Sequence, residues 1–472
     1  MTRLALAALL LCGCASSGTA RFAVRLSQND IIARNEALQR VDRDIGLLGD
    51  EPLAGYMQSV GNGLGFPQVS FSVLNSEEPN AYALDSGAVF VSRGLLALLN
   101  DEGELASVLG HETGHIAANH GKKREIASAP FDALSKTLRK LLGLIKPSVG
   151  NRVADATNTT ARVVALAPIS RAQERRADEA GVELAAAAGY DPLSLTHVLR
   201  RLEAYVAAQS TSWLDDHPPV ADRSRRMGER IAELRLPTAA AEHPTLLPML
   251  DGLVMDDHPL DGAAVASKVI HPRFGVTYEV PAGWQTERDG PVLVSSGDGC
   301  TVLLEGSTAE GSPDEVVGRN GGDGSVEPVA VEESLRRLPG KVARSRAEAA
   351  GIHVELVVFG DETRSRILSG AWPVENAATC APSFATTIAS LREANTTDVA
   401  SLPIVRLRII VAHAGESLGS LLFRHPSAWQ IERVAALNGV GADHVFEHDA
   451  AVKVPRREVW GQRGLSDTGR PP

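Results

Sequence analysis

The pentad His111-Glu112-Thr113-Gly114-His115 places two imidazoles and a carboxylate within one short segment. On an α-helix, positions i and i+4 lie on one face about a turn apart, so both imidazoles can bind a single Zn²⁺. Glu112 would then project beside them toward metal-bound water and act as a general base. The spacing therefore predicts a hydrolytic zinc site with His111 and His115 as ligands. The alternative is a surface helix that carries two histidines and no metal.

A catalytic zinc site needs a third protein ligand and an open position for water. The segment Glu174-Arg175-Arg176-Ala177-Asp178 offers two carboxylates one helical turn apart. We expect Glu174 to be the third ligand of one Zn²⁺ per chain. Asp178 could accept a hydrogen bond from the second nitrogen of a ligand imidazole and so assist catalysis. A histidine at the metzincin spacing is excluded, because Gly121 stands six residues after His115.

Several helices and a small sheet must position these residues. Val69 to Leu74 alternates as a strand and Ala88 to Val91 is a second strand, with turn residues between them, which predicts a small antiparallel sheet. Asp101, followed by Glu104 three residues later, marks the start of the helix that carries the pentad. Apolar residues at helical spacing predict helices at residues 29–49, 52–64, 95–99, 102–120, 131–145, 170–188, 192–208 and 219–234.

Four stretches between residues 29 and 234 share the motifs of a known family. They are Asn80 to Leu84 continuing to Leu96, Leu109 to His115, Arg171 to Asp178 with Gly189-Tyr190-Asp191-Pro192, and His217-Pro218-Pro219 with Arg223. In these motifs the chain resembles the gluzincin zinc metalloendopeptidases of the HtpX and CAAX-prenyl-protease type. Among them it is most similar to the periplasmic LoiP- and BepA-like lipoprotein and soluble members.

The resemblance implies which residues perform the reaction. It implies zinc on His111, His115 and Glu174, with Glu112 as general base. It also implies a substrate strand that adds to the sheet edge formed by Asn80, Ala81, Tyr82 and Ala83. The sequence departs from HtpX and the prenyl protease in lacking transmembrane helices, so their membrane-embedded chambers are not expected.

His217 has three interpretations. It could donate a hydrogen bond to the oxyanion that develops during catalysis. Resemblance to BepA-like relatives implies instead that a histidine of this loop caps the zinc and keeps the enzyme latent. A purely structural role, at the entry to the helix that follows Pro218-Pro219, is the third alternative.

The beginning of the chain predicts export. The apolar run Leu4 to Leu11 is shorter than the roughly 20 residues that span a bilayer, but it suits a signal peptide. Leu11-Cys12-Gly13-Cys14 resembles the bacterial lipoprotein box, which implies a signal peptide over residues 1–14, lipidation of Cys14 and anchoring in the outer membrane. An ordinary secretory signal, cleaved between Ala15 and Ala20, is the alternative.

Once that signal is removed, Cys300 and Cys380 are the remaining cysteines. Disulfides persist in exported proteins, so these two residues could form a bridge. Two separately buried thiols are the alternative, and the sequence leaves both open.

The length of 472 residues, at roughly 100 to 200 residues per domain, predicts several domains. The fold class expected is multidomain: a mainly α-helical zincin (α+β) peptidase domain with a small antiparallel sheet, then an α+β domain, then a small βααβ module. The boundaries expected are a signal peptide at 1–14, the peptidase domain at 15–243, a Pro- and Asp-rich linker at 244–273, the α+β domain at 274–395, the module at 403–456 and a disordered tail at 457–472.

The two trailing domains also have resemblances. Phe274 to Trp284 resembles the opening of PsbP/DcrB-type domains, which says little about function. Ile409 to Leu418 and Leu437-Asn438-Gly439 resemble a divergent LysM module, which implies binding to the N-acetylglucosamine chains of peptidoglycan. The insert from His425 to Trp429 departs from the LysM pattern, so a docking module without sugar binding is the alternative.

The charge balance and the motifs together define the expected function. The formal net charge is −11 and the chain has no long run of basic residues, so nucleic acid is not expected as a partner. We expect a zinc metalloendopeptidase that hydrolyses periplasmic or outer-membrane proteins, in envelope protein quality control. Its partners would be protein or peptide substrates, a membrane through the lipid anchor, and peptidoglycan through the LysM-like module. The alternatives are a latent zinc-site lipoprotein with a chaperone or binding role, and a hydrolase of peptidoglycan peptides.

Overall fold

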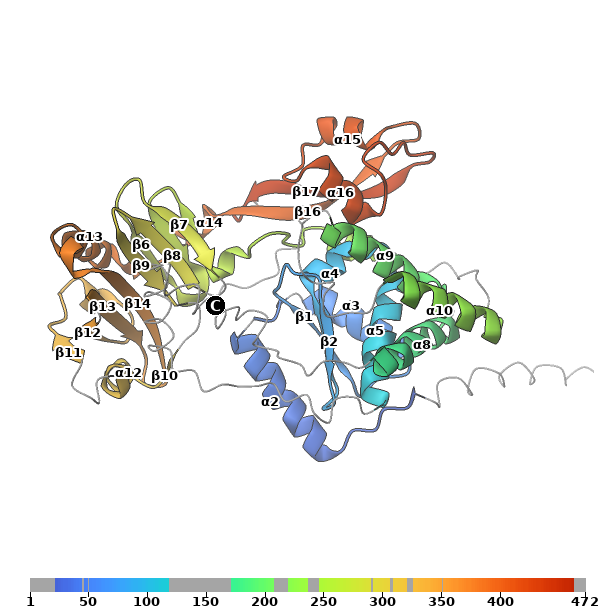
Figure 1. Cartoon of the computed structure of the whole chain (residues 1–472), viewed down its shortest axis with the longest axis horizontal. Coiled ribbons are helices and arrows are strands. Elements are labelled where there is room, and N and C mark those ends of the chain that lie inside the picture. The colour runs from blue at the N-terminus through green and yellow to red at the C-terminus, as the bar shows by residue number, and fades with distance from the viewer. Residues whose placement is uncertain are drawn as a thin grey trace, which may run out of the picture.

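A computed structural model describes most of the chain. The residues described are 22–44, 46–49, 51–118, 171–207, 220–236, 246–289, 292–305, 309–320, 326–349 and 351–461. Cys14, His217 and the helix expected at 131–145 lie outside them. Figure 1 shows three parts: an N-terminal region (residues 22–236) on the right, a strand-rich middle domain (263–400) on the left and a C-terminal module (403–461) above.

The N-terminal region is mainly helical, with a small sheet at its centre. Its helices are α2 (Gln28–Asp44), α3 (Glu51–Gly63), α4 (Arg93–Leu98), α5 (Glu102–Ala117), α8 (Arg171–Ala187), α9 (Ser194–Ala207) and α10 (Val220–Leu234). Its strands are β1 (Ser70–Leu74), β2 (Ala81–Leu84) and β3 (Ala88–Ser92).

The sheet of this region has the order β1-β3-β2, with β2 antiparallel and β1 parallel to β3. The expectation of a purely antiparallel sheet is therefore wrong. The reason is β2, a strand of only four residues between Asn80 and Asp85, in a stretch whose turn residues predicted a loop. Because β2 forms a hairpin with β3, it occupies the outer edge and leaves β1 to run parallel on the other side of β3.

Helix α5 is the centre of the N-terminal region. Every residue from Glu102 to Ile116 is buried, because α5 packs against the sheet on one side and against α8 and α9 on another. The side chain of Asp101 accepts a hydrogen bond from the Glu104 amide, so the predicted start of this helix is confirmed. A helix buried on all sides holds its side chains in defined positions, as a catalytic site requires.

The middle domain is built on two antiparallel sheets. One has the order β11-β12-β13-β14-β9-β8-β7, with β10 pairing β14, and the other has the order β15-β6-β5-β4. Their strands are β4 (Ala263–Val265), β5 (Lys268–His271), β6 (Val276–Glu279), β7 (Gln285–Asp289), β8 (Val292–Gly297), β9 (Cys300–Leu304), β10 (Ala309–Glu310), β11 (Val326–Val329), β12 (Lys341–Ala349), β13 (Ile352–Gly360), β14 (Arg364–Pro373) and β15 (Arg392–Glu393). Its helices are α12 (Pro313–Asn320), α13 (Ala377–Ser390) and α14 (Thr396–Ala400), with short turns η5 (Leu335–Arg337) and η6 (Val374–Asn376).

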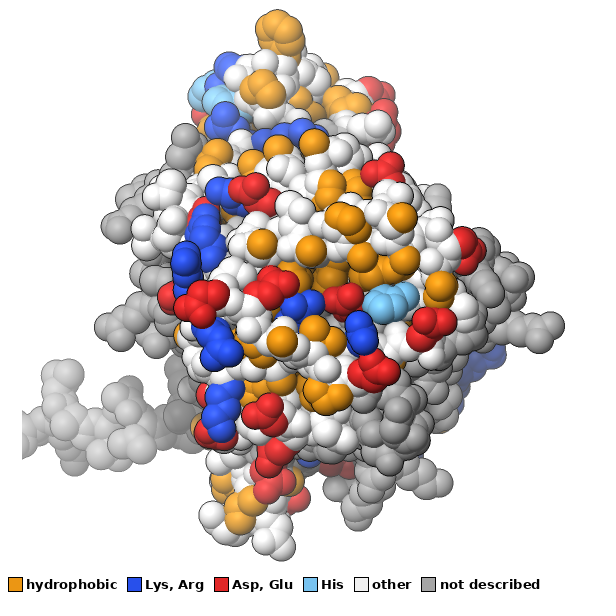
Figure 2. Space-filling view, turned by 90° about the vertical axis from the view of Figure 1, so that its left-hand side faces the viewer, with side chains coloured by type: hydrophobic (Ala, Val, Ile, Leu, Met, Phe, Trp, Pro, Cys, Tyr) orange, Lys and Arg blue, Asp and Glu red, His pale blue; other side chains and the backbone are white. Residues whose placement is uncertain are grey.

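A disulfide ties the large sheet to helix α13. The sulfurs of Cys300 on β9 and Cys380 on α13 lie 2.11 Å apart, which decides between the two alternatives that the sequence left open. Figure 2 shows basic and acidic side chains next to one another on the face at this end of the molecule. On the edge strand β11, Glu327 pairs with Arg346 of β12. Charged side chains on an edge strand discourage pairing with other chains.

The expected linker at 244–273 is wrong, because strands, short helices and backbone hydrogen bonds to the C-terminal module take up most of its described residues. Residues 263–271 form β4 and β5, which belong to the smaller sheet of the middle domain. Before them come α11 (Leu247–Leu250) and the short turn η3 (Pro259–Asp261). Between α11 and η3 the backbone runs along strand β16 of the C-terminal module (Pro403–Ala412). The amide of Leu407 donates to the carbonyl of Leu253 at 2.7 Å, and the amide of Met255 donates to the carbonyl of Val405 at 2.8 Å.

The C-terminal module has the predicted order of strand, two helices and strand. These are β16 (Pro403–Ala412), α15 (Leu418–Arg424), α16 (Ile431–Asn438) and β17 (Ala450–Val459), with the strands antiparallel. The tail expected from residue 457 is wrong for residues 457–461, since β17 continues to Val459 and the Trp460 amide donates to Leu402.

The module shares a hydrophobic core with the N-terminal region. Leu437 and Val452 of the module belong to the same buried cluster as Leu96 and Leu99. The module therefore packs as part of the same unit.

The insert that departs from the LysM pattern is part of this contact. Trp429 donates from Nε1 to Oδ1 of Asp256 at 3.0 Å, and the Arg433 guanidinium lies 3.4 Å from the centre of its ring. Tyr205 of α9 packs beside the same indole. The insert thus serves to dock the module on the N-terminal region.

Two buried histidines stabilise the junction between the parts. Nδ1 of His258 accepts from the Leu260 amide at the start of η3, and Nδ1 of His271 accepts from the Phe274 amide at the start of η4 (Pro272–Phe274). Burial and the nearby guanidinium of Arg288 lower the pKa of His271 to about 3. Burial and the guanidinium of Arg93 likewise lower the pKa of His258 well below its ordinary value. Both rings are therefore neutral acceptors at neutral pH.

These neutral rings predict a loss of stability in acid. Below about pH 6.5 the unfolded imidazole binds a proton that the folded one does not, so each ring lowers the free energy of unfolding by about 1.4 kcal/mol per pH unit. This loss continues as the pH falls toward the folded pKa. His271→Asn keeps a cap acceptor and does not titrate, so urea unfolding between pH 6 and 4 should show a slope shallower by about that amount. His413→Asn, at an exposed site, is the control, and equal slopes in both variants would contradict the prediction.

Candidate active site

Helices α5 and α8 approach closely because small residues face each other across their contact. A Cβ on Gly114 would lie 2.5 Å from the Cβ of Ala180, and one on Gly181 would lie 2.9 Å from the Ser107 carbonyl oxygen. Larger side chains here would push α8 away from α5. The sequence predictions did not use this contact, although glycines at 110 and 114, four residues apart on the pentad helix, were a signal for it.

The close contact between α5 and α8 brings the three predicted zinc ligands together. Nε2 of His111 and Nε2 of His115 are 3.3 Å apart, and the Glu174 carboxylate oxygens lie 3.9 Å and 3.6 Å from them. Four-coordinate zinc with ligand bonds of about 2.0 to 2.1 Å separates its ligand atoms by about 3.3 Å. The spacing of the two imidazoles has this value and the carboxylate is slightly farther. Among the described residues, His111, His115 and Glu174 form the group that could hold a metal ion, and all three are buried.

Asp178 orients one of these imidazoles. Its Oδ1 lies 3.2 Å from Nδ1 of His111, on the side of the ring opposite the cluster. A carboxylate in this position favours the tautomer that carries its proton on Nδ1 and leaves Nε2 as the metal ligand. Burial raises the pKa of Asp178, but His111 and Arg223 outweigh that effect and lower it to about 2. Asp178 is therefore ionised at neutral pH.

Arg223 supplies the positive charge that balances these carboxylates. Its Nη2 and Nε donate to the two oxygens of Asp178 at 2.6 Å and 3.1 Å, and Nη2 lies 3.5 Å from Glu174. Burial lowers the pKa of Arg223, but Asp178, Glu174 and Glu112 together raise it above its ordinary value. Arg223 had no predicted role beyond its place in a family motif. Its place on the buried stripe of α10, formed by Val220, Arg223, Met227 and Ile231, was the available signal.

The remaining predicted residues lie in different places. Glu112 is buried next to His111 on α5 and contributes to the charge around it. Asn80 precedes β2, and Ala81, Tyr82 and Ala83 belong to it. This strand is one of the two edge strands of its sheet among the described residues and packs beside α5. His217 and Cys14 lie outside the described residues.

A cluster of Glu102, Tyr56 and Tyr190 lies at the start of α5, and it includes the Gly189-Tyr190-Asp191-Pro192 motif, for which the sequence predicted no role. The Glu102 carboxylate accepts hydrogen bonds from the hydroxyls of Tyr56 and Tyr190. Burial and the Glu102 carboxylate raise the pKa of both tyrosines. Tyr190, in the Gly189-Tyr190-Asp191-Pro192 motif, thus connects the loop after α8 to the first turn of the pentad helix.

Comparison with known proteins identifies the family. A model described as Peptidase family M48 matches residues 52–231, which include the pentad, Glu174 and Arg223. Metalloprotease YcaL of Escherichia coli (strain K12) is 30% identical over 184 residues, which cover 38% of this chain and 69% of YcaL. The chain belongs to peptidase family M48. It is a zinc metalloendopeptidase, as the motifs predicted, and the donor set of two histidines and a glutamate suits the zinc on which M48 metalloproteases depend.

Other relatives of this M48 chain are similar over the same region. Metalloprotease LoiP of the same E. coli strain is 26% identical over 174 residues, 37% of this chain and 67% of LoiP. The beta-barrel assembly-enhancing protease of that strain is 25% identical over 201 residues, 40% of this chain and 41% of that protein. The M48 match ends before the middle domain. None of the helices in the described part of the chain is long and apolar enough to cross a membrane.

Proposed function

We propose that this M48 peptidase hydrolyses peptide bonds of periplasmic or outer-membrane proteins, in envelope protein quality control. The observation that carries the catalytic part is the buried convergence of His111, His115 and Glu174 on the helix pair that also holds Glu112. Similarity to LoiP, and to a relative named for enhancing β-barrel assembly, supports the envelope role. The lipoprotein-like start of the chain supports anchoring through Cys14.

Each residue of the site has a role in this proposal. Zinc held by His111, His115 and Glu174 would polarise the scissile carbonyl and lower the pKa of a bound water. Glu112 takes a proton from the attacking water and passes it to the leaving amine. Asp178 keeps the Nδ1 proton of His111 in place, which leaves Nε2 directed at the cluster.

The substrate would bind as an added strand. β2 is four residues long, lies beside α5 and is an edge strand among the described residues, which supports pairing of an extended peptide along Asn80 to Ala83. His217 would lie near the scissile bond, either as oxyanion donor or as a cap that keeps the site latent. A glycan contact by the LysM-like module is also a proposal, supported by its βααβ order.

The proposal predicts cleavage of unfolded outer-membrane protein. The full chain, purified in detergent and loaded with zinc, should cut an unfolded β-barrel protein and leave the same protein intact once it is folded in micelles. EDTA should abolish cleavage and zinc should restore it. The full chain purified from cells that were fed labelled fatty acid should carry the label, and Cys14→Ser should not.

Two outcomes would contradict this proposal, and a third would decide the role of His217. Release of soluble muropeptides without protein cleavage would indicate a peptidoglycan-peptide hydrolase. Cleavage only in His217→Ala would indicate a latent enzyme. Zinc binding without turnover in either form would indicate a chaperone or binding role.

A further inference from the structure

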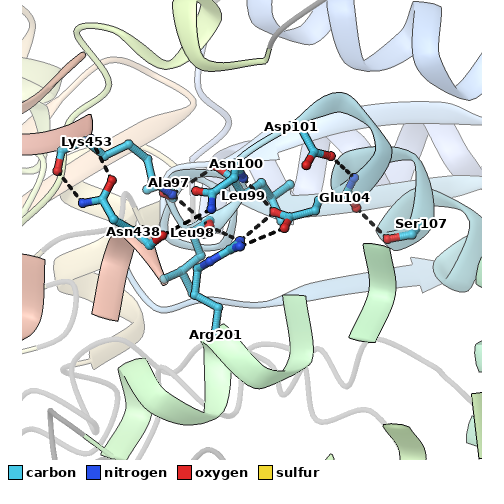
Figure 3. A network of polar contacts seen from close by, with 10 residues as sticks. All are labelled: Ala97, Leu98, Leu99, Asn100, Asp101, Glu104, Ser107, Arg201, Asn438 and Lys453. Atoms are coloured by element: carbon cyan, nitrogen blue, oxygen red, sulfur yellow. Dashed lines mark hydrogen bonds and ion pairs between the residues drawn. The ribbon is translucent and has the colours of Figure 1, made fainter. Parts of the chain in front are cut away.

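The C-terminal module reaches the entrance of the active-site helix through one buried lysine (Figure 3). Nζ of Lys453, on β17, donates to the carbonyl oxygens of Ala97, Leu98 and Leu99 at 2.8, 2.9 and 3.1 Å. Helix α4 ends at Leu98, and a helix leaves its last carbonyls without partners of its own. The module therefore completes the end of α4, two residues before α5 is capped by Asp101.

These contacts require the charged form of Lys453. Burial and the nearby Arg201 lower the pKa of Lys453 well below its ordinary value, and Glu104 and Asp101 oppose only part of that shift. Three carbonyl acceptors need three N–H donors, which the ammonium has and the neutral amine lacks. A cation at a helix C-terminus is also electrostatically favourable. The three carbonyls and the end of α4 thus favour the ammonium form of Lys453, against the effect of burial.

Arg201 of α9 holds the other side of the same corner. Its guanidinium donates to the Leu98 carbonyl at 2.8 Å and to both oxygens of Glu104, at 2.6 and 2.8 Å. Glu104 also accepts from the amide of Asn100 at 2.7 Å. The corner between α4 and α5, residues 98–101, is therefore held by ion pairs and hydrogen bonds from α9 as well as from β17.

Asn438 of α16 connects this corner to the module. It exchanges two hydrogen bonds with the Lys453 backbone, at 2.8 and 2.9 Å, and its own carbonyl accepts from the Asn100 side chain at 3.3 Å. These bonds hold the Lys453 backbone while its side chain extends to α4. A displacement of the module would be transmitted directly to the corner.

We propose that Lys453 is a positioning residue for the peptidase: by completing the α4–α5 corner, it sets where α5 presents His111 and His115 to Glu174. His111 lies seven residues after Glu104, about 10 Å along a continuous helix, so a shift at the corner is carried to the imidazoles. The hydrogen bonds that Lys453 and Asn438 make in the described part of the chain join α4, α16, β17 and Asn100, and none of them reaches α8, which carries Glu174. A shift would therefore change the spacing of the ligands. The inference rests on the zinc site of the proposed function.

The test uses Lys453→Met in the full chain. The side chain keeps its length and loses the charge and the donors, so the zinc dissociation constant should rise about tenfold. At saturating zinc, kcat should fall about fivefold while KM stays within twofold, because β2 is not moved. Arg433→Met is the matched control: it removes a different contact between the module and the N-terminal region, and should leave both constants within twofold. If Lys453→Met does not fold, Lys453→Gln, which retains two donors, replaces it.

Hydrogen exchange separates this inference from the zinc assignment. Amides of residues 99–116 should exchange at least tenfold faster in zinc-free Lys453→Met than in zinc-free wild type, whatever the metal or the activity. Wild type that binds no zinc would refute the proposed function without affecting the exchange result. A variant that only melts at lower temperature, with unchanged zinc affinity, kcat and exchange, would overturn the positioning role.

Discussion

Glu112→Gln should lower kcat for casein cleavage by about a thousandfold, within the range of about 10² to 10⁴ typical of general acid–base catalysis. The amide cannot take the proton of the attacking water, and so nothing returns that proton to the leaving amine. Zinc content should stay near that of the wild type, because the ligand atoms come from His111, His115 and Glu174. Metal analysis of the same preparation checks this second expectation.

A control distinguishes loss of the base from a general effect of charge. Glu229→Gln removes an exposed carboxylate on α10 that pairs with Arg225, and should leave kcat unchanged. Loss of zinc from Glu112→Gln in step with activity would show that Glu112 supports the metal site. Retained activity would show that it is not the base.

Arg223→Met should lower the free energy of unfolding of the zinc-free protein by about 3 to 5 kcal/mol. The substitution leaves Asp178 and Glu174 buried without the guanidinium that balances them. An unpaired buried charge is costly, since the group has lost water and gained no partner. Urea unfolding in the presence of EDTA at neutral pH measures the change.

Two further variants test this explanation. Arg226→Met, on the same helix, removes a pair with Asp222 that is partly exposed, and should cost at most about 1 kcal/mol. Adding Asp178→Asn to Arg223→Met should recover part of the loss, because the uncompensated charge is removed. A loss that the double variant does not reduce would point to packing as the cause.

The predicted zinc ligands follow local rules that the sequence displays. Two histidines at helical spacing can be recognised without knowledge of the fold, and a carboxylate pair one turn apart on a later helix supplies the third ligand. The partner of a buried arginine cannot be recognised in this way. Arg223 contacts Asp178 only because α10 packs on α8. Arg225 and Arg226 are also arginines of α10, but they pair with more exposed carboxylates of the same helix. The position of Arg223 on the apolar stripe distinguishes it.

The errors in the fold have similar causes. The burial of Lys453 on β17 was not predicted either: in an alternating strand its side chain points to the face opposite Val452 and Val454. All three are buried, because the strand has the module on one side and α4 on the other. The linker prediction failed for the same reason. Residues 252–255 show no strand pattern in the sequence, yet their backbone pairs with β16, because tertiary contacts bring the two segments together. Local sequence patterns predict helices and strands, whereas contacts between distant segments decide which of their faces are buried.

The core shared by the N-terminal region and the module joins segments that are synthesised far apart in time. Lys453 and the carbonyl of Ala97 are 356 residues apart, with the whole middle domain made between them. A growing or truncated chain that stops before β17 has the full pentad and Glu174, but its α4–α5 corner lacks the lysine that completes it. Because β17 is translated after the whole middle domain, a partial product that stops before it would carry the zinc ligands without the lysine proposed to position them.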